Sequence, residues 1–221
     1  MTLQDLFRPS ASTPIEPAAP VIPVIVLEDA RHAVPLARAC VAGGVRVLEV
    51  TLRTPAGLDA IRRIAAEVPD AWVGAGTVTS VADVGRVAAV GARFAVSPGF
   101  DRSVVAAARD LGLPLMPGVM TPSEAMAAMS EGLSMLKFFP AGPAGGIPML
   151  QALAAPFPGL SFCPTGGIDA RSAADYLALG NVLAVGGSWL TPASAIARED
   201  WAAITTLARA AASLRAGRVA A

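Results

Sequence analysis

The sequence has very little lysine: among 221 residues there is one, Lys137, and arginine supplies every other permanently charged basic side chain. Aromatic residues are also scarce, at 5% of the chain, so the core must be built from Ala, Val, Leu and Ile. Basic and acidic side chains balance at 17 each, without runs of like charge. This balance argues against nucleic acid or an anionic membrane surface as the main partner.

Long hydrophobic runs and a cysteine framework are absent as well. No apolar stretch reaches the roughly 18 to 20 residues of a membrane span, and the opening residues lack the basic head and apolar block of a secretory signal. Their Pro, Ser and Ala content predicts a short arm, residues 1–20, ahead of one domain, residues 21–221. Cys40 and Cys163 have no metal-ligand spacing, so we expect free buried thiols in a reducing cytoplasm.

The chain repeats one pattern, in which a short apolar run precedes a longer Ala-rich segment with helical spacing. Eight runs predict strands: 21–27, 46–52, 72–78, 94–99, 113–119, 135–140, 161–167 and 182–190. Continuous apolar strands between helices are typical of a parallel sheet. Eight units in this length predict an α/β fold with a single closed (β/α)8 TIM barrel. A doubly wound open sheet is the alternative, although the nucleotide fingerprint expected of it is missing.

Polar residues and glycines lie late in these strands, at the end where barrels bind ligands. Side chains alternate between the two faces of a strand. In the second expected strand Glu49, Thr51 and Arg53 share one parity and the apolar residues share the other, so we expect the polar set to point into the barrel. Lys137 and Phe139 share a face of the sixth strand. A cation, an acid and a second cation are therefore predicted in one enclosed space.

Two interpretations of Lys137 are open at this point. A buried ion pair of Glu49 with Lys137 or with Arg53 could merely fix the strands, although desolvation of both ions offsets most of their attraction. Alternatively, Lys137 is a nucleophile. A free lysine is almost entirely an ammonium ion at neutral pH, whereas burial among apolar groups near a guanidinium disfavours the charged form. Only a primary amine forms an imine with a ketone, which would explain why this one lysine is kept.

The second interpretation assigns chemistry to the neighbouring residues. A protonated imine withdraws electrons from the adjacent carbon and stabilises the carbanion or enamine left when a carbon–carbon bond breaks. Glu49 is the inward carboxylate available to move protons during this reaction. Arg53 and Thr77 could supply a bidentate fork and a hydroxyl for the carboxylate of a keto acid.

Six motifs on six expected strands also resemble one family. In order between about residues 21 and 192, "GVRVLEVTLRT", "VGAGTV", "FAVSPG", "KFFPA", "FCPTGGI" and "VGGSWL" are similar to motifs of the bacterial 2-keto-3-deoxy-6-phosphogluconate (KDPG) aldolases, also described as 4-hydroxy-2-oxoglutarate (KHG) aldolases. The resemblance implies a class I aldolase without metal or other cofactor, on a (β/α)8 barrel, assembled as a homotrimer in the cytoplasm. Its substrate would be a small phosphorylated keto acid.

The resemblance carries roles over to individual positions. Lys137 matches the residue that forms the Schiff base, and Glu49 matches the general acid–base. Arg53 and Thr77 match the residues that hold the pyruvate carboxylate. Three further positions match the walls around the pyruvyl methyl group and its flank: Pro98, Phe139 and Thr165.

A phosphate site is expected at the last two strands. There "TGGI" and "VGGS" place flexible backbone N–H groups at helix N-termini, where phosphates commonly bind in barrels. The candidate contacts are Gly166, Gly167 and Ser188. The alternative is that these glycines serve only the tight turns between strand and helix.

Other functions stay open on the sequence alone. Phosphorylated gluconate and galactonate derivatives and 4-hydroxy-2-oxoglutarate would all yield pyruvate by the same chemistry. A phosphate-binding barrel without imine chemistry, such as an epimerase or a synthase, would use Lys137 only as a point charge. A catalytically silent barrel used for assembly would have no reason to collect Glu49, Arg53 and Lys137 on inward-facing sites.

Overall fold

The computed structural model describes residues 4–7 and 18–214, so most of the expected arm 1–20 and the tail after residue 214 lie outside the described residues. The strands within the described ranges are β1 (Val21–Ile25), β2 (Val47–Thr51), β3 (Trp72–Gly76), β4 (Ala95–Val96), β5 (Leu115–Met116), β6 (Gly118–Val119), β7 (Met135–Phe138), β8 (Ser161–Pro164) and β9 (Val185–Gly187). Each of the eight runs predicted as strands contains at least one of them. The run 113–119 contains two, which are separated at Pro117, a residue without a backbone N–H.

Helices connect the strands. They are η1 (Gln4–Leu6), η2 (Ala30–His32), α1 (Ala33–Ala42), α2 (Gly57–Glu67), α3 (Val81–Ala89), α4 (Arg102–Asp110), α5 (Pro122–Ser130), α6 (Gly146–Ala154), α7 (Ala173–Leu177), α8 (Ala193–Ala197) and α9 (Trp201–Ser213). Polar caps begin several of them: Ser80, Asp101 and Thr121 accept backbone N–H groups at the starts of α3, α4 and α5. No helix in these two described ranges is long and apolar enough to cross a membrane.

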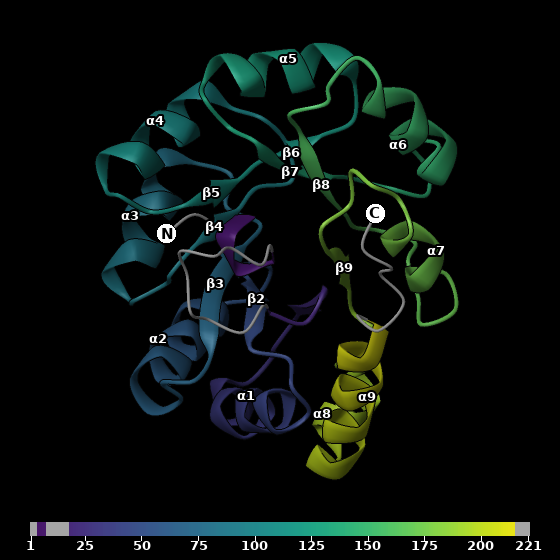
Figure 1. Ribbon diagram of the computed structural model, residues 1–221. Helices are drawn as coiled ribbons and strands as arrows, with labels where there is room; N and C mark the ends of the chain where they lie inside the picture. The colour runs from purple at the N-terminus through teal and green to yellow at the C-terminus, as the bar shows by residue number, and fades with distance from the viewer. Residues whose placement is uncertain (1–3, 8–17, 215–221) are drawn as a thin grey trace.

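The strands form an α/β fold with a curled parallel sheet of six strands, in the order β5-β4-β3-β2-β1-β9, and a second parallel sheet in the order β6-β7-β8. Isolated bridges from Phe162 to Val182 and from Thr165 to Gly186 connect β8 to the segment around β9. Figure 1 shows the strands curling about a common centre with α1 to α9 on the outer side. A doubly wound sheet would have helices on both faces, so that alternative does not describe this fold.

The apolar core has two parts that follow the predicted parity. Leu48 and Val50 belong to the larger part, between strands and helices. The smaller part, here named the inner cluster, lies on the concave side of the sheets, and its ten members come from both sheets and from the N-terminal segment: Phe7, Ile22, Val47, Phe94, Val96, Met116, Met135, Cys163, Leu183 and Ala184. The inner cluster therefore fills the space beneath the positions where the polar residues were expected.

Candidate active site

Lys137 and Glu49 meet inside the curled sheets. The Nζ atom of Lys137 donates a hydrogen bond to Oε1 of Glu49 at 3.2 Å, and the two residues are only 3% and 2% exposed. Lys137 follows Met135 of the inner cluster by two residues on β7, and Glu49 follows Val47 by two residues on β2. The pair thus forms the first polar layer above an apolar one, and the cationic and acidic groups that parity predicted on the inner side are in contact.

Room for this pair depends on a glycine in the next strand. β3 pairs with β2 so that Gly74 lies opposite Glu49 and Gly76 lies opposite Thr51. A Cβ atom on Gly76 would lie 2.2 Å from Oε1 of Glu49 and 2.7 Å from its Cγ, well inside van der Waals contact. Gly76 is needed because the carboxylate occupies the space that any other side chain would fill. Gly76 was not among the predicted site residues, although the alternation along "WVGAG" places it inward.

The amine of Lys137 lies beneath an aromatic ring. Its Nζ atom is 5.3 Å from the ring centroid of Phe139, the residue directly after β7, so the two side chains lie on the same side as parity predicted. On the neighbouring strand Cys163 is the register partner of Lys137. Burial raises the pKa of the Cys163 thiol to about 12, an effect that Lys137 opposes and Glu49 reinforces. Cys163 is therefore a neutral thiol in the wall beside the amine, where a thiolate could compete with it as a nucleophile.

Arg53 and Thr77 form a second group at the rim. The Nε atom of Arg53 donates to Oγ1 of Thr77 at 3.3 Å. Thr77 has a φ of 61°, one of two non-glycine residues in the described ranges with positive φ. Such backbone costs on the order of 1–3 kcal/mol and is typical of functional sites. Arg53 is exposed, in contrast to the prediction of a guanidinium enclosed with Lys137, and a bound carboxylate could reach it from solvent.

Three positions expected around the reacting carbon differ in burial. Thr165 is buried, and its backbone carbonyl accepts from Ala141 in the loop after β7. Phe139 is half-buried over the amine, whereas Pro98 is exposed at the end of β4. The carbonyl of Pro98 lies 2.2 Å from where a Cβ on Gly118 would be, so the β4 and β6 segments approach closely at this level.

The candidate phosphate contacts lie after β8 and β9. Gly166 and Gly167 have φ values of 97° and 79°, a backbone region that favours glycine, and Ser188 is exposed. Thr165 and Gly186 form a bridge between the two segments, and a Cβ on Gly186 would lie 2.2 Å from Oγ1 of Thr165. The three candidates therefore belong to adjacent strand ends. The left-handed backbone also serves the turn itself, so both interpretations of the glycines fit this geometry.

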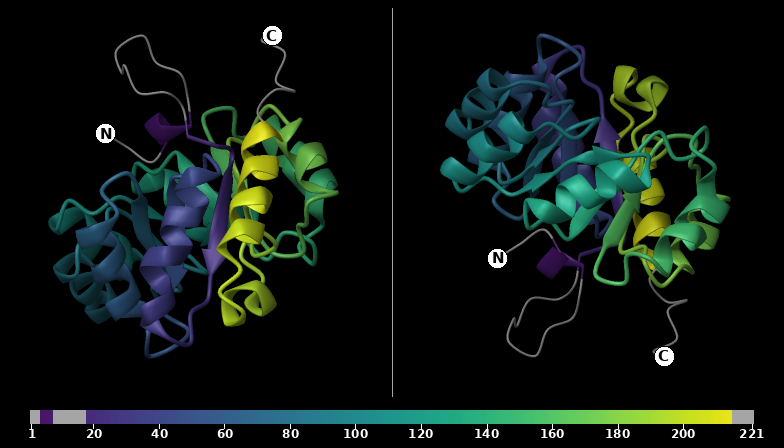
Figure 2. Two further views of the ribbon diagram at one scale, coloured as in Figure 1. Left: turned by 90° about the horizontal axis from the view of Figure 1, so that it is seen from below. Right: turned by 90° about the horizontal axis from the view of Figure 1, so that it is seen from above.

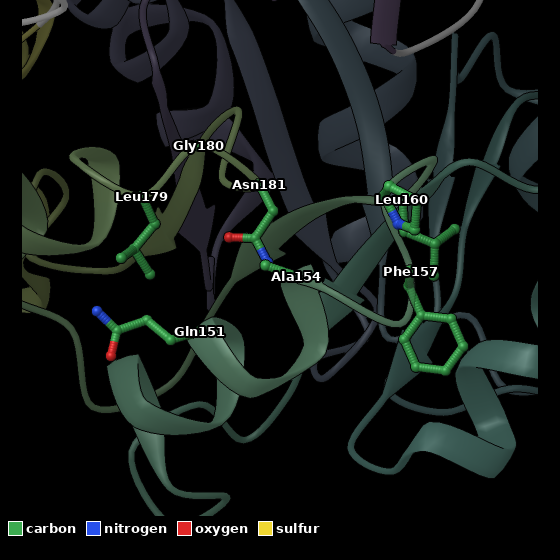
Figure 3. A pocket seen from close by; sticks show the side chains of 8 residues that line it. Gln151, Ala154, Phe157, Leu160, Leu179, Gly180 and Asn181 are labelled. Carbon is green, nitrogen blue, oxygen red and sulfur yellow. The ribbon is translucent and has the colours of Figure 1, made fainter.

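A pocket of about 340 Å³ lies away from all of these residues, and it is lined by Gln151, Ala154, Phe157, Pro158, Leu160, Leu179, Gly180 and Asn181 (Figure 3). These residues come from the end of α6 and from the segments before β8 and after α7, which is the amino end of the strands. The Nδ2 atom of Asn181 donates to the carbonyl of Leu150 at 2.7 Å and fixes the two segments to each other. The pocket holds none of the predicted site residues.

Metal ligands do not gather in the described part of the chain, where no group of three or more His, Cys, Asp or Glu side chains could hold an ion. The two cysteines are free and buried, as predicted. Burial also raises the pKa of Cys40 to about 12. The polar groups of the candidate site form two contacts, an amine with a carboxylate in the interior and a guanidinium with a hydroxyl at the rim.

Comparison with known proteins identifies the family. The family model for KDPG and KHG aldolase matches residues 15–207. The 2-dehydro-3-deoxy-phosphogluconate aldolase of Dickeya dadantii is 56% identical over 192 residues, which cover 87% of this chain and 90% of that protein. The KHG/KDPG aldolase of Escherichia coli K12 is 55% identical over 190 residues, covering 86% and 89%.

A solved structure gives the same result. The KDPG aldolase of Legionella pneumophila, with pyruvate captured at low pH as a covalent carbinolamine intermediate, superposes with a TM-score of 0.86 at 48% identity and covers 88% of this chain and 94% of its own. The chain belongs to the KDPG and KHG aldolase family.

Proposed function

We propose that the chain is a class I aldolase that cleaves 2-keto-3-deoxy-6-phosphogluconate to pyruvate and glyceraldehyde 3-phosphate, and also 4-hydroxy-2-oxoglutarate to pyruvate and glyoxylate. The observation that carries the proposal is the buried contact of 3.2 Å between Lys137 and Glu49. An amine used only for stability has no reason to be there, because a buried ion pair is a weak stabiliser. The names of the relatives, which include aldolases of both types, support the same substrates.

Lys137 is the proposed nucleophile. Its neutral amine attacks the C2 ketone of the substrate to give a carbinolamine, and loss of water gives an iminium ion. Glu49 then takes the proton from the C4 hydroxyl, the bond between C3 and C4 breaks, and its electron pair moves toward the iminium nitrogen. The aldehyde leaves with C4, and the bound enamine takes a proton at C3. Hydrolysis of the resulting imine releases pyruvate and restores the amine.

Glu49 is the proposed acid and base in these steps, because its carboxylate already lies within hydrogen-bond reach of the reacting nitrogen. Arg53 and Thr77 hold the substrate carboxylate, with the guanidinium as a fork and the hydroxyl beside it. Their existing hydrogen bond of 3.3 Å keeps both groups at one place on the rim. Phe139, Pro98 and Thr165 then surround the methyl end of the pyruvyl group.

The substrate phosphate would bind at Gly166, Gly167 and Ser188. The helices α7 and α8 begin only at Ala173 and Ala193, so the candidate residues, contrary to expectation, do not stand at helix N-termini. Successive backbone N–H groups in a turn also bind anions, and barrels commonly bind phosphate at their last strands. The bridge between Thr165 and Gly186 keeps the two loops adjacent. A phosphogalactonate substrate would use the same contacts, and steady-state rates with each of the three acids distinguish the alternatives.

We further infer that the domain expected at residues 21–221, whose described part ends at residue 214, is one closed (β/α)8 barrel preceded by the expected arm 1–20. Three observations support closure. The inner cluster draws members from both sheets, β5 and β6 belong to one run interrupted at Pro117, and the bridges at Phe162 and Thr165 connect β8 to the segment around β9. A barrel of this kind places its ligand at the carboxyl ends of the strands, and Lys137 and Glu49 lie on that side of Met135 and Val47 of the inner cluster.

Assembly as a homotrimer in the cytoplasm completes the proposal. Met120, Met126 and Met129 expose apolar side chains on and beside α5. Adjacent exposed apolar side chains on one helix are typical of a surface that a subunit contact covers. The buried free thiols Cys40 and Cys163 fit a reducing compartment.

Borohydride reduction in the presence of pyruvate tests the imine. Because the chain has one lysine, a reduced adduct can form only at Lys137 or at the N-terminal amine, and peptide mass spectrometry separates the two. We expect the adduct at Lys137. An unchanged mass at that peptide would remove the proposal.

The variant Lys137→Arg distinguishes the aldolase from a barrel that uses Lys137 as a point charge. Lys137→Arg keeps the charge but cannot form an imine with the substrate, so we expect kcat to fall by a factor on the order of 10⁴ or more. An epimerase or synthase that needs only a cation would retain part of its activity. Full activity in EDTA is expected as well, and a loss that zinc or magnesium restores would indicate a metal-dependent reaction instead.

A further inference from the structure

The N-terminal segment contributes one large side chain to the interior. η1 lies over the centre of the ring of strands in Figure 1, and Figure 2 places it at the end where β1 begins. The Oγ atom of Ser134, the residue before β7, donates to Oε1 of Gln4 at 2.6 Å. The backbone N–H of Phe7 donates to the carbonyl of Gln4 at 3.1 Å. The segment is therefore attached at the amino ends of the strands, opposite the proposed active site.

Phe7 enters the inner cluster from this end. It is 4% exposed, and it is the one member of the inner cluster that lies more than two residues from any strand. The other members are strand residues or their immediate neighbours. Phe7 was not among the residues predicted to lie in the interior, although Leu3, Leu6 and Phe7 have the i, i+3, i+4 spacing of an apolar helix face.

The inner cluster is also the floor of the proposed active site. Met135 precedes Lys137 by two residues on the same face of β7, and Cys163 is the register partner of Lys137 on β8. Met116 and Met135 are unbranched and flexible, so they follow any void left beneath them. A reactive amine needs a floor that does not move and does not admit water, since water stabilises the ammonium form.

We propose that Phe7 closes the amino end of the interior. It thereby excludes water from the inner-cluster residues beneath Lys137 and holds them in position. Phe7 does not touch the reacting atoms and acts as a positioning residue through Met116, Met135 and Cys163. The closure of the interior is inferred from the place of Phe7 in the inner cluster. The effect on imine formation rests on the proposed aldolase activity.

Cys163 reports on closure independently of activity. In the folded protein its thiol is buried, so a water-soluble thiol reagent should modify it very slowly. Phe7→Ala opens the interior from below, and we expect the rate of modification of Cys163 to rise about tenfold or more, because local opening controls access to buried groups. Cys40 lies in α1, outside the inner cluster, and is the internal control. Peptide mass spectrometry gives the two rates in the same sample.

Phe157→Ala is the matched control variant. Phe157 is also a buried phenylalanine outside the strands, at 7% exposed, but it belongs to the larger part of the core, between strands and helices. Both variants lose a comparable apolar contact, so both should lower the melting temperature. Only Phe7→Ala should expose Cys163. A Phe7→Leu variant refills most of the space and should restore slow modification.

The catalytic half is measured with the same variants. In single-turnover trapping with pyruvate and borohydride we expect Phe7→Ala to slow adduct formation at Lys137 about tenfold, as displacement of a nucleophile by a fraction of an ångström does. kcat should fall by the same factor, KM should change little because the rim is intact, and Phe7→Leu should restore both.

The outcomes separate the two halves. An unchanged rate of modification of Cys163 in Phe7→Ala overturns the proposed closure by Phe7. An equal rise in the rate at Cys40 also overturns it, because it would indicate general loosening of the fold. A selective rise at Cys163 with normal trapping at Lys137 overturns the link to catalysis and leaves the aldolase proposal intact. No trapping in the unaltered protein would instead remove the proposed function and leave closure to stand on the thiol rates.

Discussion

The two ends of the strands differ in the kind of side chain that they turn inward. At the amino end the inner side is filled by the apolar inner cluster and closed by Phe7. One layer toward the carboxyl end stand Lys137 and Glu49, and beyond them Arg53 meets Thr77. The apolar and the polar side chains are only two positions apart on one strand, as Met135 and Lys137 are on β7. The same strands therefore supply stability at one end and chemistry at the other, and substitutions on either side of the boundary should have separable effects.

Glu49→Gln tests the reactive side with the largest expected effect in this comparison. Glutamine is nearly isosteric and can still accept a hydrogen bond from Lys137, but it cannot take up a proton. We expect kcat to fall by about 10²–10⁴, the usual contribution of a general acid–base. Steady-state kinetics measure the loss, and the far-ultraviolet circular dichroism should be unchanged. A variant with near-normal kcat would show that another group moves the protons.

Replacing both charged residues tests whether the ion pair of Lys137 and Glu49 contributes to the free energy of unfolding. Lys137→Met combined with Glu49→Met removes the ion pair and leaves two flexible apolar side chains. Buried ion pairs exchanged for apolar groups are often neutral or gain about 1–4 kcal/mol. We expect urea unfolding to give a free energy of unfolding equal to or above that of the unaltered protein, with activity abolished.

Each single replacement is the control for the double variant. Lys137→Met alone leaves the Glu49 carboxylate buried without its partner, so it should be less stable than the double variant. If the double variant were the least stable of the three, the pair would be a structural element and the boundary would have no functional meaning.

Sequence reasoning reached the reactive side of the boundary through parity. Alternation along β2 and β7 put Glu49 and Lys137 inward, and the structure brings them to 3.2 Å. Parity could not give the position of Arg53, because that residue lies beyond the end of β2, where the chain no longer alternates. Its exposed guanidinium and the positive φ of Thr77 are properties of loops that no periodicity encodes.

The apolar side was less predictable for a different reason. The eight strand runs could be recognised because each is continuously apolar. Several of their ends were placed too late, since for example β4 ends before Pro98 and β8 ends before Gly166, and Pro117 divides one expected strand into two. Phe7 reaches the interior through a tertiary contact of an isolated segment. The spacing of Leu3, Leu6 and Phe7 indicates an apolar turn, but it does not say which part of the fold that turn packs against.

Gly76→Ala places a methyl group against the carboxylate of Glu49, where the apolar and polar regions meet. Its Cβ would lie 2.2 Å from Oε1 of Glu49, so the carboxylate must move away from Lys137. We expect a loss of about 1–3 kcal/mol in the free energy of unfolding from overpacking, together with a lower kcat. Gly85→Ala is the matched control: Gly85 lies in α3 with no atom within 4 Å of its added Cβ, and alanine there should stabilise the helix by up to about 1 kcal/mol. Equal effects of the two variants would contradict the assigned role of Gly76.

Asp169 provides the smallest test, at the carboxyl end but outside the enclosed space. The backbone N–H of Ser172 and the side chain of Arg171 hold the pKa of this carboxyl at about 2, below its ordinary value near 3.8. Because the folded value is the lower one, the stabilisation is fully present above about pH 4 and is lost as the pH falls toward 2. Asp169→Asn should therefore be modestly less stable than the unaltered protein at pH 7, and the difference should shrink between pH 4 and pH 2. Urea unfolding at several pH values measures it, and kcat at pH 7 should change far less than in Glu49→Gln, because the carboxylate stabilises a turn and takes no part in proton transfer.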